Sequence, residues 1–297
     1  MSNIINRNGS DYIVEDQQEN GLFFGFKLKS KKPLFSKKSE FQKVEVYESE
    51  KHGMLLLNDD LMMVSERDEF VYHEMIAHVP LFTHDNPENV LVVGGGDGGT
   101  AREVLRHKKV KKCVMVEIDK AVVDACVGYI PATASELTAN SRLELKIEDA
   151  VTYVAETKEK FDVILVDSTD PIGPAAPLFG PDFYNNIKKV LKPDGIVVSQ
   201  GESCWYESEM QTVLLKLLND RFSTTKIYNF SNLTYPGGLW SFTYASDKYN
   251  PLAIDEENLK NKIASSGLSF KYYNQGIHKA AFCLPTFMSD KLKDYLS

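Results

Sequence analysis

The stretch "VLVVGGGDGGTAREV" at residues 90–104 constrains the fold more than any other part of the chain. Four apolar residues lead into a glycine-rich turn, and a helical pattern follows. Its glycines satisfy the spacing GxGxxG, which in a strand–turn–helix unit sets the phosphates of a nucleotide at a helix N-terminus. Asp97 lies inside this turn, where a carboxylate repels phosphate. The turn therefore predicts a nucleotide-binding type of fold but argues against a pyrophosphate ligand.

The chain after residue 88 alternates short apolar runs with helical patterns. Strands are predicted at 89–93, 113–118, 143–147, 161–167 and 195–200. Helices are predicted at 99–108, 120–129, 149–158, 182–191 and 207–219. This alternation predicts an α/β fold, a Rossmann-like doubly wound and mainly parallel sheet with its ligand at the carboxyl ends of the strands. The tail adds predicted strands near 224–230 and 238–245 and predicted helices near 255–265 and 286–296.

The N-terminal part of the chain has a different pattern. Polar and apolar residues alternate on both sides of a turn at Lys51-His52-Gly53, which predicts a β-hairpin. An amphipathic helix is predicted at 66–81, stopped by Pro80. We therefore expect an N-terminal β-strand and hairpin domain at residues 1–65 and a Rossmann-like catalytic domain at residues 66–297.

Composition excludes several classes of protein. The 297 residues are 43% hydrophobic and 26% charged, as in an ordinary globular protein, and the formal net charge of −8 argues against a nucleic-acid partner. No apolar run approaches the ~20 residues of a membrane span, and the first residues lack the apolar core of a signal peptide. Scattered cysteines with no CxxC pair favour free thiols, so we expect a cytoplasmic protein without a membrane partner. These cysteines are Cys113, Cys126, Cys204 and Cys283.

Acidic residues stand at the ends of the next two predicted strands. Glu117 follows the glycine turn by about twenty residues, where a carboxylate accepts both ribose hydroxyls. Asp149 ends the following strand and is placed to accept a hydrogen bond from an adenine amine. A solvated strand-end acid is the alternative for Glu117, and Asp149 also suits the N-cap of the helix at 149–158. Together they predict an adenosine site.

The fourth strand end, "FDVILVDSTDPIGPA" at residues 161–175, is the most informative. It delivers Asp167 and Asp170 to the edge where Asp97 lies, and its prolines and glycine predict an irregular loop at 169–180 that covers a site. Such a carboxylate cluster needs a cationic ligand. At an effective dielectric constant near 20, unit charges ~4 Å apart interact by roughly 4 kcal/mol, about a thousandfold in affinity.

A metal site is not expected at the two histidines of the predicted helix at 66–81. His73 and His78 are one residue too far apart for the HExxH pattern, so they do not share one face of a helix as zinc ligands do.

Five segments together resemble the spermidine synthase (putrescine aminopropyltransferase) family: "GGGDGG", "VEID", "DSTDPIGPA", "ERDEFVYHEM" and "LTYPGG". The resemblance runs from about residue 40 to residue 285. It implies an N-terminal β-domain and a Rossmann-like domain that together transfer the aminopropyl group of decarboxylated S-adenosylmethionine to putrescine, releasing methylthioadenosine. It also implies no prosthetic group, no metal, and a homodimer or homotetramer.

The resemblance assigns roles to individual residues. Asp97 would bind the donor's ammonium, Glu117 its ribose, and Asp149 its adenine. The implied donor site comprises Gln42, Gly94, Gly96, Asp97, Glu117, Asp149, Ala150 and Pro174. Catalysis would rest on Asp167 and Tyr72, which handle the attacking amine. The implied acceptor site comprises His73, Asp97, Asp167, Asp170, Glu202 and Tyr235.

Departures from the family pattern leave the acceptor open. Met63 replaces a glutamine near the donor sulfonium, and Leu233 replaces a proline; Asn58 and Asp60 are also atypical. A tryptophan common near the acceptor has no clear match, with Phe23 or Phe24 as the candidate substitute. Agmatine, cadaverine and spermidine are therefore alternative acceptors, and a non-catalytic nucleoside- or polyamine-binding protein is a further alternative. A methyltransferase using intact S-adenosylmethionine is disfavoured because Asp97 opposes the carboxylate of that donor.

Overall fold

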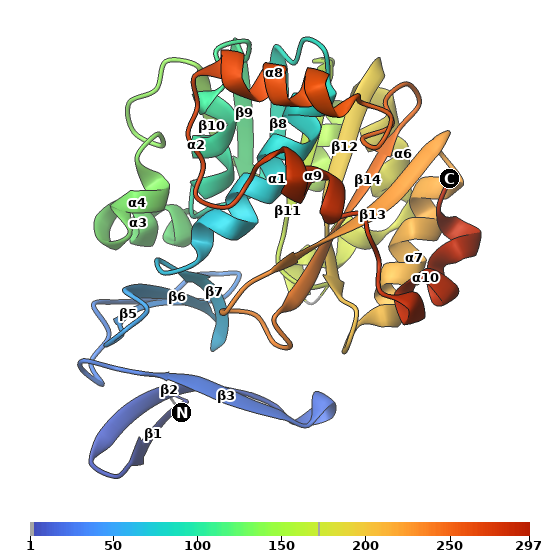
Figure 1. The fold of residues 1–297 in the computed structure, drawn as a ribbon. Helices are drawn as coiled ribbons and strands as arrows, with labels where there is room; N and C mark the ends of the chain where they lie inside the picture. The colour runs from blue at the N-terminus through green and yellow to red at the C-terminus, as the bar shows by residue number, and fades with distance from the viewer. Residues whose placement is uncertain (1–2, 172) are drawn as a thin grey trace.

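The computed structural model describes residues 3–171 and 173–297, which form two small antiparallel sheets and a seven-stranded sheet covered by helices (Figure 1). Residues 1–2 of the predicted N-terminal domain and residue 172 of the predicted loop at 169–180 lie outside the described residues. Within the described residues, no helix is long and apolar enough to cross a membrane.

The large sheet has the strand order β10-β9-β8-β11-β12-β14-β13. Its strands are β8 (Asn89–Gly94), β9 (Lys112–Glu117), β10 (Leu143–Ile147), β11 (Phe161–Asp167), β12 (Leu191–Ser203), β13 (Thr224–Ser231) and β14 (Leu239–Ser246). β8 to β12 pair in parallel, whereas β14 is antiparallel to both neighbours. The strand order reverses at β8, which has β9 on one side and β11 on the other, and ligands of doubly wound sheets bind at such a switch point. The predicted fold class is confirmed.

Helices cover both faces of this sheet, which explains the unbroken apolar runs of its strands. One face carries α1 (Glu69–Thr83), α2 (Gly99–Arg106), α8 (Glu256–Ser266) and α9 (Gln275–Ala280). The other carries α5 (Ala150–Glu156), α6 (Pro181–Val190) and α7 (Ser208–Asn219), and α10 (Thr286–Leu292) packs beside α7. Along β8, Val90 and Val92 join the first core, whereas Leu91 and Val93 join the second. A strand buried on both faces needs apolar side chains at every position.

The N-terminal sheets extend below the large sheet in Figure 1. The first contains β1 (Ile4–Arg7), β2 (Ser10–Gln17) and β3 (Leu22–Lys27), and the second contains β4 (Phe35–Lys38), β5 (Lys43–Glu48), β6 (Met54–Asn58) and β7 (Leu61–Ser65). The predicted hairpin is β5–β6, with Gly53 at φ 71°. The second sheet packs on α3 (Lys120–Tyr129), where Val46 and Leu56 share a core with Cys126. α4 (Pro131–Ala134) follows α3. The proposed domain division at residues 65 and 66 falls between β7 and α1 and stays a prediction.

The prediction that Pro80 ends the first helix is wrong. α1 runs from Glu69 to Thr83 with Pro80 inside it, and the His84 amide donates to the Pro80 carbonyl at 2.9 Å. All but one of the helix residues are buried, so tertiary packing outweighs the one hydrogen bond that proline cannot donate. The helix begins at Glu69, later than predicted, and the side chain of Asp68 at its N-cap position makes no capping hydrogen bond. Its carboxylate instead accepts hydrogen bonds from Thr234, far along the chain.

Candidate active site

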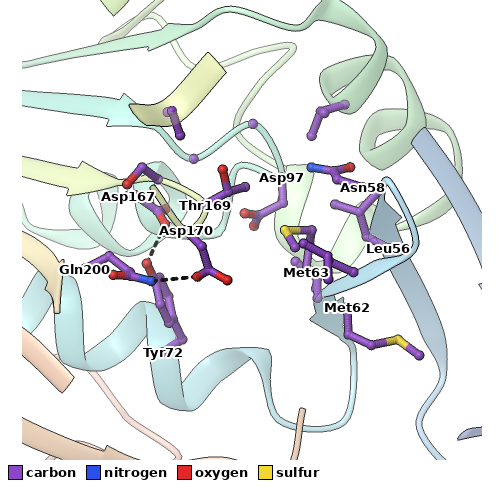
Figure 2. A pocket seen from close by; sticks show the side chains of 18 of the residues that line it. Leu56, Asn58, Met62, Met63, Tyr72, Asp97, Asp167, Thr169, Asp170 and Gln200 are labelled. Carbon is purple, nitrogen blue, oxygen red and sulfur yellow. Dashed lines mark hydrogen bonds between the residues drawn. The ribbon is translucent and has the colours of Figure 1, made fainter. Parts of the chain in front are cut away.

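A cavity of about 280 Å³ lies at the carboxyl ends of β8, β9 and β11, and the second N-terminal sheet closes its other side. Figure 2 shows Tyr72, Asp167, Asp170 and Gln200 on one side of this cavity and Asn58 and Met63 on the other. The lining includes all the predicted site residues except Glu202: Gln42, Tyr72, His73, Gly94, Gly96, Asp97, Glu117, Asp149, Ala150, Asp167, Asp170, Pro174 and Tyr235.

The glycines of the β8–α2 turn make room for the acids. Gly94 has φ +77°, and a Cβ there would collide with the carbonyl oxygen of Asp167. A Cβ at Gly96 would lie 2.9 Å from Glu117 Oε2. These positions therefore need glycine for close packing of three strand ends, whether or not a nucleotide is bound.

Asp97 lies within this turn and is 8% exposed. Its Oδ1 accepts a hydrogen bond from the Gly99 amide at 2.8 Å and lies 3.2 Å from His73 Nε2. No described residue bonds its second oxygen, Oδ2. The carboxylate is thus oriented by the start of α2 and keeps one oxygen for a ligand.

Asp167 forms the best-defined pair of the site with Tyr72. The Tyr72 hydroxyl donates to Asp167 Oδ1 at 2.8 Å, and Thr100 donates to Oδ2 at 2.7 Å (Figure 2 draws the first bond). Burial, together with Asp97, raises the pKa of Asp167 to about 6. Burial also raises the pKa of Tyr72 well above its ordinary value, so its hydroxyl stays neutral and donates. Asp167 is therefore ionised at neutral pH but close to accepting a proton.

Two further residues of the predicted donor site meet through Asp119, the N-cap of α3. The Asp119 amide donates to Glu117 Oε1 at 2.8 Å, and Gln42 Nε2 donates to Asp119 Oδ2 at 3.2 Å. Burial raises the pKa of Glu117 to about 7. Hydrogen bonds through Asp119 thus hold the end of β9 and the loop before β5 in a fixed position relative to each other, and both line the cavity.

Asp149 fits both of its predicted roles. Its carboxylate caps α5 by accepting from the Val151 amide at 2.9 Å, yet the residue also lines the cavity beside Ala150 and Pro174. Helix capping alone therefore explains its acidic side chain, and its ligand role stays a prediction.

Glu202 is placed differently from the other predicted residues. It is fully buried on β12 at φ +65° and does not line the cavity. Gln200 lines the cavity instead and donates to Asp170 Oδ1 at 3.3 Å. Neither Glu202 oxygen makes a hydrogen bond of ordinary geometry, and burial together with Asp170 raises its pKa well above the usual range. Its charged form is therefore disfavoured, and the carboxyl group lies behind the cavity wall.

Glu15 is a cavity residue that sequence reasoning missed. It lies on β2, is 3% exposed, and accepts from the Met62 amide at 2.7 Å and from Gln17 at 2.5 Å. Burial raises its pKa to about 7, and Asp170 adds to the effect. The sequence around Glu15 does not mark it as a site residue, because a single acid in a β-strand pattern is usually exposed to solvent.

The aromatic residues on the acceptor side of the cavity are not the ones that the sequence suggested. Neither Phe23 nor Phe24 lines the cavity, and Phe23 is 59% exposed. Tyr235 and Trp240 line it instead, and the Tyr235 hydroxyl donates to the Met63 carbonyl at 2.9 Å.

Among residues 3–171 and 173–297, two groups of side chains have atoms close enough to share a metal ion. In the first, His73 with Asp97 and Asp167, both ring nitrogens of His73 already contact carboxylates. The second comprises His84, Asp162 and Asp194. There Lys192 Nζ lies 2.8 Å from Asp162 and supplies the positive charge. We assign a metal to neither group.

The fold and cavity define the class: Rossmann-like α/β proteins with an acidic site at the strand ends. Residues 69–256 match the family described as "Spermine/spermidine synthase domain", and residues 15–66 match "Spermidine synthase tetramerisation domain".

Known proteins are similar to this chain over nearly its whole length. A polyamine aminopropyltransferase of Bacillus subtilis is 45% identical over 95% of this chain and 99% of its own, and one of Methanocaldococcus jannaschii is 45% identical over 89% of each chain. The solved spermidine synthase of Thermotoga maritima aligns with TM-score 0.86 and 34% identity over 95% of this chain and 94% of its own. A spermidine synthase solved with the transition state analogue AdoDATO gives TM-score 0.89 and 35% identity over the same shares. The chain therefore belongs to the spermidine synthase family and is a polyamine aminopropyltransferase.

Proposed function

We propose that this aminopropyltransferase uses decarboxylated S-adenosylmethionine as donor and putrescine as acceptor, giving spermidine and methylthioadenosine. The observation that carries the proposal is the buried Asp97 of a nucleoside-type turn, which shares one cavity with Asp167 and Asp170. Such a site favours ligands that carry several positive charges, as the donor and a diamine both do. The analogue bound to a solved relative supports the same donor.

The donor would lie between the large sheet and the second N-terminal sheet. Glu117 would accept from the ribose hydroxyls, and Asp149 with the backbone of Ala150 would read adenine. Asp97 would hold the ammonium of the aminopropyl group. Gln42, Gly94, Gly96 and Pro174 would contact the nucleoside.

The reaction needs mainly alignment. The amine nitrogen of the acceptor forms a bond to the methylene carbon beside the sulfonium, and the carbon–sulfur bond breaks with its electron pair going to sulfur. The departing thioether is neutral, so no general acid is needed. Asp167, whose raised pKa suits proton transfer, would accept the proton lost by the amine while Tyr72 orients it.

The far end of the acceptor would be held as an ammonium. Asp170 faces this part of the cavity with Gln200, and Tyr235 forms its wall; His73 would flank the amine near Asp97. Glu15 adds a second buried acid there. A monoamine would leave these carboxylates without a partner, which is costly in a buried site.

The test is mass spectrometry of products formed from the decarboxylated donor and a panel of amines. We expect spermidine from putrescine as the fastest reaction, with cadaverine, agmatine and spermidine slower. Butylamine, which matches putrescine in length but lacks the second amine, is the control. Equal rates for butylamine and putrescine at low concentration would contradict two-ended binding, and a faster agmatine reaction would overturn the choice of acceptor.

We also propose that the protein works in the cytoplasm as a homodimer or homotetramer. Free cysteines, three of them buried, support a reducing compartment. The match of residues 15–66 to a tetramerisation domain supports assembly through the N-terminal sheets. Sedimentation analysis distinguishes two subunits from four.

A further inference from the structure

His73 bridges two carboxylates deep in the site. Its Nδ1 lies 2.6 Å from Glu69 Oε2 and its Nε2 lies 3.2 Å from Asp97 Oδ1. The ring is 3% exposed and packs directly on Gly99, where any Cβ would collide with it. The Nδ1 contact with Glu69 is a hydrogen bond, and Nε2 faces Asp97 at ion-pair distance. A neutral imidazole has one N–H, so the form that suits a carboxylate at each nitrogen is the doubly protonated ring. Before the donor binds, His73 is therefore held as an imidazolium between Glu69 and Asp97.

Charges on every side of the ring support this state. Glu69 lies on the same helix and Asp97 on the glycine turn, while Asp167 approaches from β11. Burial alone would lower the pKa of His73, but Asp97 and Glu69 raise it to about 10. Arg102 Nη2, on α2, lies 2.8 Å from Glu69 Oε2 and helps to keep Glu69 ionised.

We propose that His73 exchanges its Nε2 proton for the ammonium of the donor. The Nε2–H bond breaks and the proton leaves to solvent. The donor's ammonium then binds Asp97 and donates a hydrogen bond to the freed Nε2 lone pair, while Nδ1–H remains on Glu69. Glu69 and Arg102 are the positioning residues, because they hold the tautomer that leaves Nε2 as an acceptor. The inference rests on the proposed donor and deepens it.

Relative magnitudes favour exchange over sharing of Asp97 by two cations. An imidazolium and an ammonium ~4 Å apart repel each other by about a thousandfold in affinity at an effective dielectric constant near 20. Removing a proton at pH 8 from a group with a pKa of about 10 costs roughly a hundredfold. Release of the proton is therefore the less costly course by about tenfold.

Calorimetric titration at pH 8 in buffers of different ionisation enthalpy counts the protons released on binding. We expect about one proton for the decarboxylated donor. Methylthioadenosine, which lacks the ammonium, is the ligand control and should release almost none. Asp167 and Glu117 have pKa values of about 6 and 7, so at this pH they are already ionised and contribute little. Donor affinity should also rise about fivefold from pH 7 to pH 8, with the slope approaching tenfold per pH unit above pH 8.

Substituted proteins test whether the released proton comes from His73. His73→Gln should abolish both the release and the pH dependence of donor affinity. Glu69→Gln should cut the release to less than half, whereas Arg102→Lys, which keeps the charge, should retain most of it. Glu209→Gln, on the exposed start of α7, is the matched control and should leave the count unchanged.

Two outcomes distinguish failure of the proton exchange from failure of the proposed donor. Tight donor binding by the unaltered enzyme without proton release would overturn the exchange and leave the proposed donor intact. Failure of the donor to bind while methylthioadenosine still binds would overturn the proposed donor itself. Because the first measurement needs no variant, misfolding of a substituted protein does not affect it.

Discussion

Single carboxylates in this protein differ in charge because they differ in burial and partners. Asp167 keeps two hydrogen-bond donors, Tyr72 and Thr100, and so remains ionisable near neutral pH despite its burial. Glu202 lacks such donors and is buried more completely, so the pKa of its carboxyl group is raised well above the usual range. Acids of similar appearance in the sequence therefore have different chemistry in the folded chain.

Asp167→Asn should lower kcat about 100-fold or more, because the amide cannot accept the proton of the attacking amine. Methylthioadenosine should still bind. In the unaltered enzyme with the donor saturating, kcat should fall as pH drops below about 6, since Asp167 becomes protonated there. Steady-state kinetics across pH check this, with Asp182→Asn, on the exposed start of α6, as the control. A kcat within a few-fold of the unaltered value would remove Asp167 from this role.

Asp170→Asn should raise the KM for putrescine about tenfold while changing kcat less, because it removes binding shared by ground and transition states. Glu202→Gln should change the KM by less than about twofold, since burial disfavours the charged form of this carboxyl group and it lies outside the cavity. Initial rates over a range of putrescine concentrations compare the two. A larger effect at Glu202 than at Asp170 would show that Glu202 binds the acceptor directly.

At the scale of elements, the β8–α2 unit organises the site. β8 ends at Gly94, and the turn passes through two more glycines of positive φ before α2 begins. The turn presents Asp97, and the helix supplies Thr100 to Asp167 and Arg102 to Glu69. One short strand–turn–helix unit thus presents one carboxylate of its own and bonds two others, on β11 and on α1.

Gly94→Ala should destabilise the protein by roughly 3 kcal/mol, because it combines a left-handed backbone with a collision against β11. We expect thermal denaturation to show a fall in Tm of about 5 °C or more. Gly128→Ala is the matched control: that glycine lies in α3 with open space around it, so the change should be neutral or stabilising by up to about 1 kcal/mol. Equal Tm values for the two variants would contradict the close-packing role of the turn.

At the scale of the whole molecule, the cavity depends on how the second N-terminal sheet is joined to the large sheet. The second N-terminal sheet shares a hydrophobic core with α3, and α3 follows directly after the strand end that carries Glu117. Gln42, from the N-terminal side, bonds Asp119 at the start of α3. The packing that joins the sheets therefore also shapes the donor half of the cavity.

Val46→Ala tests this coupling, since Val46 is fully buried between β5 and α3. We expect a loss of about 2 kcal/mol and one cooperative transition in scanning calorimetry, because both sheets depend on the same core. Methylthioadenosine at 100 times its Kd should restore about 2.7 kcal/mol. Val213→Ala, at a half-exposed position of α7, is the control and should have little effect. Two separate transitions, with only one of them shifted by Val46→Ala, would show that the sheets unfold independently.

Local sequence determined the architecture of the large sheet and the position of most acids around the cavity. Apolar runs buried on both faces and a glycine turn are short-range features, so the strands from β8 to β11 and the acids at their ends follow from spacing alone. Parallel strands direct their carboxyl ends to one edge, which is why Asp97, Glu117 and Asp167 were predicted to lie together.

Tertiary structure alone decided which other groups meet these acids. Glu15 and Glu69 reach the site from elements whose packing no local pattern specifies, and burial of nearly all of α1 carries that helix past Pro80. The same long-range packing places Glu202 behind the cavity wall while Gln200, two residues away, faces into it. Burial and long-range contacts depend on the whole chain, and these are the terms that set the protonation of each carboxyl group.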